Sequence, residues 1–228
     1  MEAYVSQLEG PIAVQVWNPL YAYAREVLSQ SGSGASRAQL FPVLRILTVL
    51  GQIVSTTSAL EDRRLRRDLQ DTYVKILDAV LSGVAKGGEA TTWERDGQLS
   101  ADSSSIQEKQ GSGTGPPVYS FVGGNVVRNL RTFLSDNDRV LSACSAISQS
   151  LVVPVFRRHK FNDDATVTLL REMAKIPPAA KAWRPPLADA FNDNRFFKIT
   201  PPQSEPWKPL VCALMDSDKE RFTELIGK

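Results

Sequence analysis

The stretch ALEDRRLRRDLQDTYVKILDAVLSGV, residues 59–84, decides the fold class. Its apolar residues recur every three or four positions, which is the spacing of one face of an α-helix. This stripe consists of Leu65, Leu69, Tyr73, Ile76, Val80 and Val84. Charged residues occupy the other side, and Gly87–Gly88 follow in the position of a helix stop. The segment is therefore predicted to be one amphipathic helix with a buried face.

The same spacing extends in both directions along the chain. Residues 10–28 have one apolar face, which Pro19 should bend or split, and residues 36–54 are apolar over most of their circumference. After a cap at Asp136–Asn137, an apolar stripe runs to Pro154, which should end or kink the helix. Shorter helices are expected at 126–134, at 163–176 after a cap at Asn162, at 183–191 and at 207–214, with a last one after Ser217. No segment alternates with the period of a strand.

These patterns predict an all-α protein. Helices joined by short turns that contain Pro, Asn or Asp indicate antiparallel helix pairs, arranged as a HEAT/armadillo-like α-solenoid segment. Residues 87–118 differ, because they are rich in Ser and Gly and contain few large apolar residues. We therefore expect a helical repeat segment at 1–86, a flexible Ser/Gly-rich linker at 87–118, and a second helical repeat segment at 119–228 that packs with the first as one domain.

Charge and cysteine content restrict the environment. The 27 basic and 25 acidic residues leave a net charge of only +2, so an electrostatic partner must bind a local patch. The two cysteines have no paired spacing and no N-glycosylation sequon occurs, which favours a cytoplasmic location. The N-terminus does not resemble a signal peptide, and no apolar run approaches the ~20 residues of a membrane span. Any membrane contact is expected to be peripheral.

The sequence offers little for catalysis. His159 is the only histidine, and neither Cys144 nor Cys212 lies at a zinc-ligand spacing from it. A Cys144–His159 nucleophile pair requires the fold to bring the two together, whereas Cys144 lies on an apolar stripe typical of a buried structural cysteine. The GSGTG run at 111–115 lacks the lysine and hydroxyl of a phosphate loop. We expect a non-enzymatic protein without a cofactor or metal.

Two basic clusters are candidates for partner contacts. Arg63, Arg64, Arg66 and Arg67 are interleaved with Glu61, Asp62, Asp68 and Asp71 at salt-bridge spacing, which favours a solvated helix face over a lipid or partner site. Arg157, Arg158 and Lys160 have no acidic residue closer in sequence than Asp163. They either complement the C-terminus of a helix or contact an acidic partner surface or anionic phospholipid. Nucleic-acid binding would need a broader basic stripe.

A third group is aromatic. Trp183, Phe191, Phe196, Phe197 and Trp207 cluster around prolines and are expected to form a core between short helices, with a partner-binding groove as the alternative.

The passage KAWRPPLADAFNDNRFFKITPPQSEPWKPLVCALMDSDKERFTELIGK, residues 181–228, resembles a stretch in the C-terminal region of the fungal Dopey family. The resemblance rests on a helix led by Trp183, the turn Asp193–Phe197, the Trp207 helix, and Asp216–Asp218 before Phe222 and Leu225. Residues 59–80 also look like the family's preceding helix. Because family chains are far larger, this chain would be a fragment of one.

The resemblance implies a large helical scaffold, peripheral on Golgi and endosome membranes. It also implies a giant HEAT-repeat partner related to Arf exchange factors, and links to a phospholipid flippase and to kinesin. No functional residue can be carried over from the family. Two alternatives remain from the residues: a helical-repeat scaffold of another pathway, and a lipid-binding helical domain with an apolar cavity lined by 40–54 and 140–155.

The last apolar residues suggest a contact surface at the end of the array. In a solenoid each repeat covers the apolar face of its neighbour. Phe222, Leu225 and Ile226 lack a following polar cap, so they are candidates for an end-face contact and for self-association.

Overall fold

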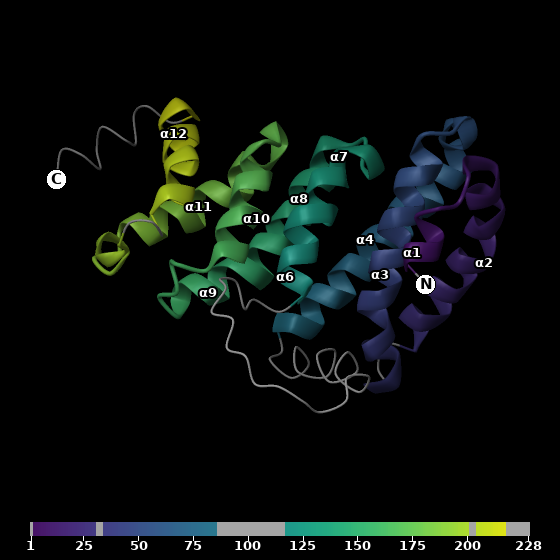
Figure 1. The fold of residues 1–228 in the computed structure, drawn as a ribbon, viewed down its shortest axis with the longest axis horizontal. Helices are drawn as coiled ribbons and strands as arrows, with labels where there is room; N and C mark the ends of the chain where they lie inside the picture. The colour runs from purple at the N-terminus through teal and green to yellow at the C-terminus, as the bar shows by residue number, and fades with distance from the viewer. Residues whose placement is uncertain (1, 31–33, 86–116, 201–203, 218–228) are drawn as a thin grey trace, which may run out of the picture.

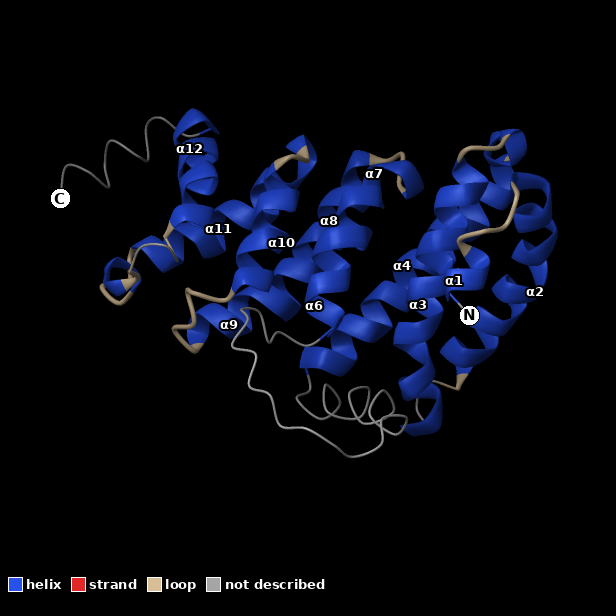
Figure 2. Cartoon of the chain, in the orientation of Figure 1, coloured by secondary structure: helices blue, strands red, loops and turns tan. Residues whose placement is uncertain are grey.

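The computed structural model describes residues 2–30, 34–85, 117–200 and 204–217, and within these ranges the only regular structure is helical. Figure 2 shows the absence of strands among the described elements. The helices are α1 (Glu2–Val5), α2 (Gly10–Ser29), α3 (Gly34–Ser55), η1 (Ser58–Glu61), α4 (Arg63–Ala85), α6 (Pro117–Phe121), η2 (Val122–Val127), α7 (Arg128–Phe133), α8 (Asn137–Ile147), η3 (Ser148–Val152), α9 (Val153–Arg157), α10 (Asp164–Ala174), η4 (Pro177–Ala179), α11 (Ala180–Phe191), η5 (Phe196–Lys198), η6 (Glu205–Trp207) and α12 (Lys208–Ser217). The all-α prediction is confirmed.

The helices advance along the long axis of the molecule, from α2 at one end to α12 at the other (Figure 1). Contacts between elements divide them into two layers. One layer consists of α3, the segment α6–η2–α7, α10 and α12, and the other of α2, α4, the segment α8–η3–α9 and α11. Each layer packs on the other, so one apolar core runs through the array. This arrangement agrees with helix pairs, while the HEAT/armadillo type stays a prediction.

Helix α4 buries the stripe that the sequence predicts. Leu69, Tyr73, Ile76 and Val80 are buried, and the hydroxyl of Tyr73 lies 3.2 Å from Oγ1 of Thr48 on α3. Because Thr48 already donates to the carbonyl of Leu44, the Tyr73 hydroxyl must be the donor to Thr48. Burial raises the pKa of Tyr73, so this hydroxyl stays protonated.

The start of this helix differs from the prediction. Residues 59–84 do not form one helix, because η1 ends at Glu61 and α4 begins at Arg63. Between them, Asp62 accepts a hydrogen bond from the backbone N–H of Arg64 (2.8 Å), as a capping residue does.

Prolines do not end the helices in which they lie. Helix α2 continues through Pro19, where burial of Trp17, Ala24 and Val27 offsets the roughly 3 kcal/mol cost of an interior proline. The helix from Asn137 likewise passes Pro154 and ends at Arg157. The π-helical turn η3 ends at Val152, two residues before Pro154, and its longer hydrogen-bond spacing accommodates a residue that has no backbone N–H.

Two helical segments, Ala38–Ser55 and Asn137–Arg157, are long and apolar enough by composition to cross a membrane, contrary to the expectation from the sequence. Half of the first segment and 44% of the second are buried inside the fold. Leu44, Leu50, Ile147 and Leu151 belong to the core, which accounts for the apolar composition of both.

Some predictions lie outside the described residues. The predicted linker 87–118 does so apart from Pro117 and Val118, which belong to α6. The end-face candidates Phe222, Leu225 and Ile226 also lie outside, so self-association through them stays a prediction.

Candidate functional site

The predicted basic residues lie where α9 ends and the chain turns toward α10. Arg157 is the last residue of α9, Arg158 caps the helix, and Lys160 follows two residues later. All three side chains are exposed. A cation in the last turn of a helix is favourable because the terminal carbonyls carry partial negative charge.

His159, between these cations, has an unusual backbone conformation. Its N–H donates to the carbonyl of Phe156 (2.8 Å), and the N–H of Lys160 donates to that of Val155 (3.2 Å). This is the Schellman pattern, in which glycine usually occupies the left-handed position. Here His159 occupies it with φ 56°, and among the described residues it alone, apart from glycine, has a positive φ. The conformation costs roughly 1–2 kcal/mol for a residue with a Cβ.

A contact from a distant turn holds the His159 side chain. Nδ1 of His159 lies 2.6 Å from Oδ2 of Asp193, which follows the end of α11. The other carboxylate oxygen, Oδ1, accepts a hydrogen bond from the N–H of Arg195 (2.9 Å). The backbone N–H of Arg195, and then the imidazole of His159, lower the pKa of Asp193. The turn after α9 is thereby joined to the turn after α11.

Aromatic rings fill the space beneath this contact. Phe196 packs edge-on against Phe191 and Trp207, with centroid distances of 4.7 and 4.8 Å. Phe156 and Phe161 lie 5.5 Å apart, and the indole N–H of Trp207 donates to the carbonyl of Phe161 (3.0 Å). The rings come from α9, the following turn, α11, η5 and η6. The cluster therefore fixes the relative positions of the two turns.

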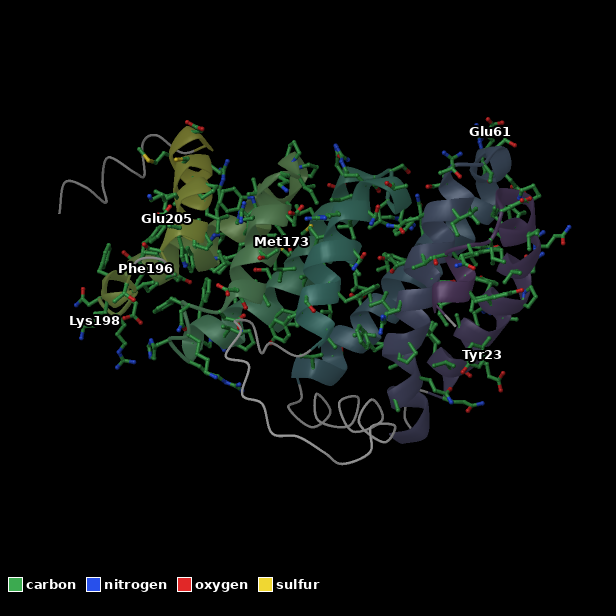
Figure 3. The ribbon with its side chains drawn as sticks, in the orientation of Figure 1. Tyr23, Glu61, Met173, Phe196, Lys198 and Glu205 are labelled. Atoms are coloured by element: carbon green, nitrogen blue, oxygen red, sulfur yellow. The ribbon has the colours of Figure 1, made fainter. Side chains whose placement is uncertain are left out.

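Phe197 departs from the prediction that this aromatic group forms a core. Its side chain is 72% exposed, whereas Trp183 and Trp207 are buried. In the short 3-10 turn η5, consecutive side chains diverge, so Phe196 faces the cluster and Phe197 projects away. Its neighbours Arg195 and Lys198 are also exposed. Figure 3 shows Phe196 and Lys198 near the end of the molecule that carries α12.

We call Arg158, Lys160, Arg195, Phe197 and Lys198 the basic–aromatic corner. It combines two cations from one turn with an exposed ring and two cations from the other. Sequence reasoning identified the first turn, but it named Phe197 only within the aromatic group expected to form a core and did not select Arg195 or Lys198. The sequence signal was the Phe196–Phe197 pair next to Lys198, because consecutive side chains of a 3-10 turn point in different directions; the pair alone does not show which ring is exposed.

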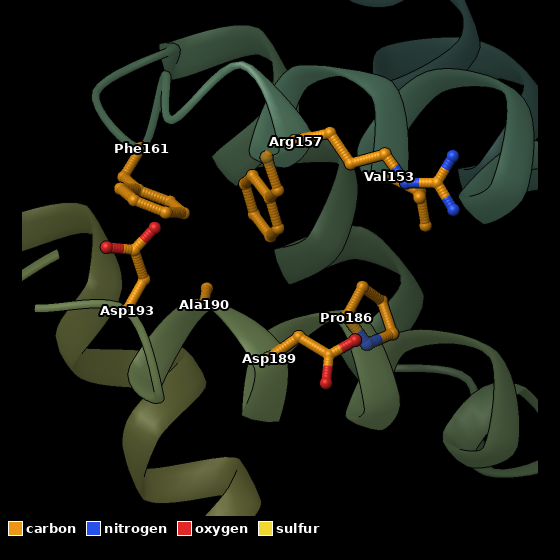
Figure 4. A pocket seen from close by; sticks show the side chains of 8 residues that line it. Val153, Arg157, Phe161, Pro186, Asp189, Ala190 and Asp193 are labelled. Carbon is orange, nitrogen blue, oxygen red and sulfur yellow. The ribbon is translucent and has the colours of Figure 1, made fainter. Parts of the chain in front are cut away.

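A cleft of about 220 Å³ lies beside the corner, between α9 and α11 (Figure 4). Its lining is largely apolar, from Val153, Phe156, Phe161, Pro186 and Ala190. Three charged residues complete the lining, Arg157 from α9 and Asp189 and Asp193 from the end of α11. Thus Arg157, which the sequence groups with Arg158 and Lys160, also borders this cleft.

The residues considered for nucleophilic catalysis and metal binding have different surroundings. Cys144 is buried in α8 as predicted, and burial raises the pKa of its thiol to about 12. The imidazole of His159 contacts Asp193 instead of a cysteine. Across the described ranges, no three His, Cys, Asp or Glu residues are grouped as metal ligands are.

The arginines of α4 lie in a different setting. Arg63, Arg64 and Arg67 are exposed and share their surface with acidic residues. Asp71, which lies at salt-bridge spacing from Arg67 in the sequence, pairs with Arg139 of α8 instead (2.7 Å).

Comparison with known proteins identifies the family. The family model described as DOP1 C-terminal matches residues 1–228. The chain belongs to the DOP1 C-terminal family. Its similarity to the Dopey family, first suggested by residues 181–228, is confirmed.

Curated relatives come from fungi and animals. Protein dop1 of Emericella nidulans is 29% identical over 99% of this chain and 12% of its own length. Protein DOP1 homolog of Drosophila pseudoobscura pseudoobscura is 24% identical over 99% of the chain and 9% of its own length. Protein DOP1B of Mus musculus is 25% identical over 80% of the chain and 9% of its own length. The chain thus spans about a tenth of these DOP1 proteins. No solved structure matches it.

Proposed function

We propose that this chain is a non-enzymatic scaffold segment of a Dopey-type protein, acting in Golgi–endosome membrane traffic at the cytoplasmic surface of the membrane. Membership of the DOP1 C-terminal family supports this proposal, together with a two-layer helical array. The whole protein would bind protein partners through other surfaces of the array. By family resemblance these are a giant HEAT-repeat Golgi protein and, through further links, a flippase or kinesin.

One observation carries the membrane part of the proposal, namely the composition of the basic–aromatic corner. Phe197 is the most exposed of the large apolar side chains among the described residues. Transfer of a phenylalanine side chain from water to an apolar phase is worth about 1.5–3 kcal/mol. Each basic residue near an anionic surface adds ~1 kcal/mol. An exposed ring that shares two joined turns with the exposed cations Arg158, Lys160, Arg195 and Lys198 thus suits a peripheral contact with anionic phospholipid.

The alternative of a lipid-binding domain has less support. The expected feature is an apolar cavity lined by residues 40–54 and 140–155. The three clefts described lie between α9 and α11, between α2 and α4, and between α4 and α8. Residues 40–54 line none of these three. The largest, about 390 Å³, is bordered by Arg25, Asp68, Asp71 and Lys75, whose charges do not suit an acyl chain.

Vesicle flotation tests the membrane contact. The protein is mixed with phosphatidylcholine vesicles that contain or lack phosphatidylserine, at low and at high salt. We expect binding that requires phosphatidylserine and weakens with salt. Changing Arg158, Lys160 and Lys198 to Glu should lower binding at least tenfold, since three basic residues at ~1 kcal/mol each are lost.

The matched control is the change of Arg63, Arg64 and Arg67 to Glu on α4. It alters the net charge equally but affects cations that are interleaved with acidic residues. If both triple variants lose vesicle binding equally, net charge alone explains the loss. The basic–aromatic corner would then not be the membrane contact. Phe197→Ser should weaken binding several-fold without changing the salt dependence.

A further inference from the structure

The cleft between α9 and α11 differs chemically from the corner beside it (Figure 4). Its floor is apolar, formed by Val153, Phe156, Phe161, Pro186 and Ala190. Its volume of about 220 Å³ is below the roughly 300–1,000 Å³ of pockets that bind small organic ligands. The cleft is the right size for one inserted side chain from a larger partner. Anchors of this kind dominate protein–protein binding energy.

The wall formed by α11 carries negative charge. Asp189 lies in the last turn of α11, which contains no basic residue, and Asp193 follows the helix. The terminal carbonyls of a helix carry partial negative charge, so a carboxylate at this end reinforces the negative potential instead of neutralising it. In the part of the chain that the structure describes, Asp189 forms no ion pair or hydrogen bond, whereas Asp193 is engaged by His159. Asp189 is therefore available to a cation from outside.

The opposite wall bears Arg157, which also forms no ion pair within the described residues. A cleft with a cation on one wall and a carboxylate on the other discriminates between partners by orientation. An anionic phospholipid headgroup is disfavoured beside Asp189 and Asp193. A peptide segment can complement both parts of the cleft at once. Its apolar side chain would contact the floor, and a neighbouring cation would face the acidic wall formed by α11.

We propose that this cleft binds a segment of a protein partner that inserts an aliphatic side chain between α9 and α11 and pairs an adjacent lysine or arginine with Asp189. The site is independent of the membrane contact, because it uses the opposite charge and different side chains. It would allow the same end of the molecule to bind a protein and a membrane.

The probe is a displayed library of random peptides, selected against the whole chain. We expect the selected peptides to share an aliphatic residue next to Lys or Arg. Asp189→Lys should weaken their binding at least tenfold, and replacing the peptide's basic residue with Glu should restore binding to that variant. Val153→Trp, which fills the cleft from a half-buried position, should weaken binding without any change in charge.

Asp216→Lys is the matched control, because Asp216 is an exposed carboxylate in the last turn of α12 and does not line the cleft. It should leave peptide binding unchanged. Selection of acidic peptides, or of peptides insensitive to both Asp189→Lys and Val153→Trp, would overturn the proposal. Preferential binding of a second copy of the chain, measured by sedimentation and abolished by Val153→Trp, would also overturn it. Vesicle binding should survive Asp189→Lys, so the two proposals can fail separately.

Discussion

Two groups of basic residues on this molecule differ in their surroundings. On α4, Arg63, Arg64 and Arg67 share their surface with acidic residues, and the nearest aromatic ring in the helix, Tyr73, is buried in the core. At the basic–aromatic corner, the cations come from two turns that are distant in sequence and joined by the His159–Asp193 contact, and the second turn also carries the exposed ring of Phe197. The number of cations is similar in the two groups. Their acidic neighbours and the position of the aromatic ring distinguish a solvated helix face from a candidate contact surface.

The largest expected difference in stability is between variants of the two aromatic residues, Tyr73 and Phe197. Tyr73→Ala should lower the free energy of unfolding by about 3–5 kcal/mol, since it leaves a cavity beside Phe133 and removes the hydrogen bond to Thr48. Phe197→Ala should change it by less than about 0.5 kcal/mol, as is usual for exposed positions. Urea unfolding of both variants measures the difference. A large loss of stability in Phe197→Ala would mean that this ring supports the fold and is not kept for binding.

Local patterns were enough to predict the buried faces. The stripes at Leu69–Val80 and at Val140–Leu151 are buried, because period alone determines which side of a helix an apolar residue occupies. The cap at Asp136 is confirmed, since its side chain accepts from the N–H of Asp138. The second cap is Asp163, one residue after the predicted Asn162, because its carboxylate reaches the N–H of Thr166. Neighbouring capping residues cannot be ranked from sequence when both have suitable side chains.

The site depended on contacts that local patterns do not contain. Sequence spacing made Asp163 the nearest acidic residue to the Arg157–Lys160 cluster, but in the fold Asp193 contacts His159 across 34 residues. The exposure of Phe197 follows from the direction of a three-residue turn and from how Phe191 and Trp207 hold Phe196. Only tertiary packing brings the second turn beside the first. The first turn of the corner, with Arg158 and Lys160, could therefore be predicted, whereas the second turn, with Arg195, Phe197 and Lys198, could not.

Substitutions at His159 should have an intermediate effect on stability. They also sharpen the comparison of the two basic groups, because the α4 group has no equivalent strained residue. At φ 56°, a Cβ is unfavourable, and glycine would relieve the strain. His159→Gly and His159→Ala both remove the contact with Asp193. The difference between their unfolding free energies therefore measures the cost of the left-handed backbone conformation alone. We expect the glycine variant to be more stable than the alanine variant by about 1 kcal/mol. Thermal unfolding compares them, and equal stabilities would contradict the Schellman geometry at this position.

The smallest expected effect is the pH dependence contributed by Asp193. Its pKa in the folded protein is lowered, first by the N–H of Arg195 and then by His159, so the folded state favours the ionised carboxylate. The resulting stability is fully present above the unfolded-state pKa of about 4 and is lost as the pH falls through the lower folded-state value. The difference in unfolding free energy between the native chain and Asp193→Asn should therefore shrink as the pH falls below about 4.

Because the N–H of Arg195 is the larger cause, most of this acid dependence should persist when His159 is changed to Ala. Urea unfolding at several pH values in the background of each variant measures both differences. If the difference in unfolding free energy between the native chain and Asp193→Asn does not shrink below about pH 4, the contacts of Asp193 do not stabilise its ionised form. The link between the two turns would then rest on the aromatic cluster alone, and the corner would keep its shape in acid. If His159→Ala instead removes the whole pH dependence, the imidazole and not the backbone holds Asp193, which would make His159 the residue that positions the second turn of the corner.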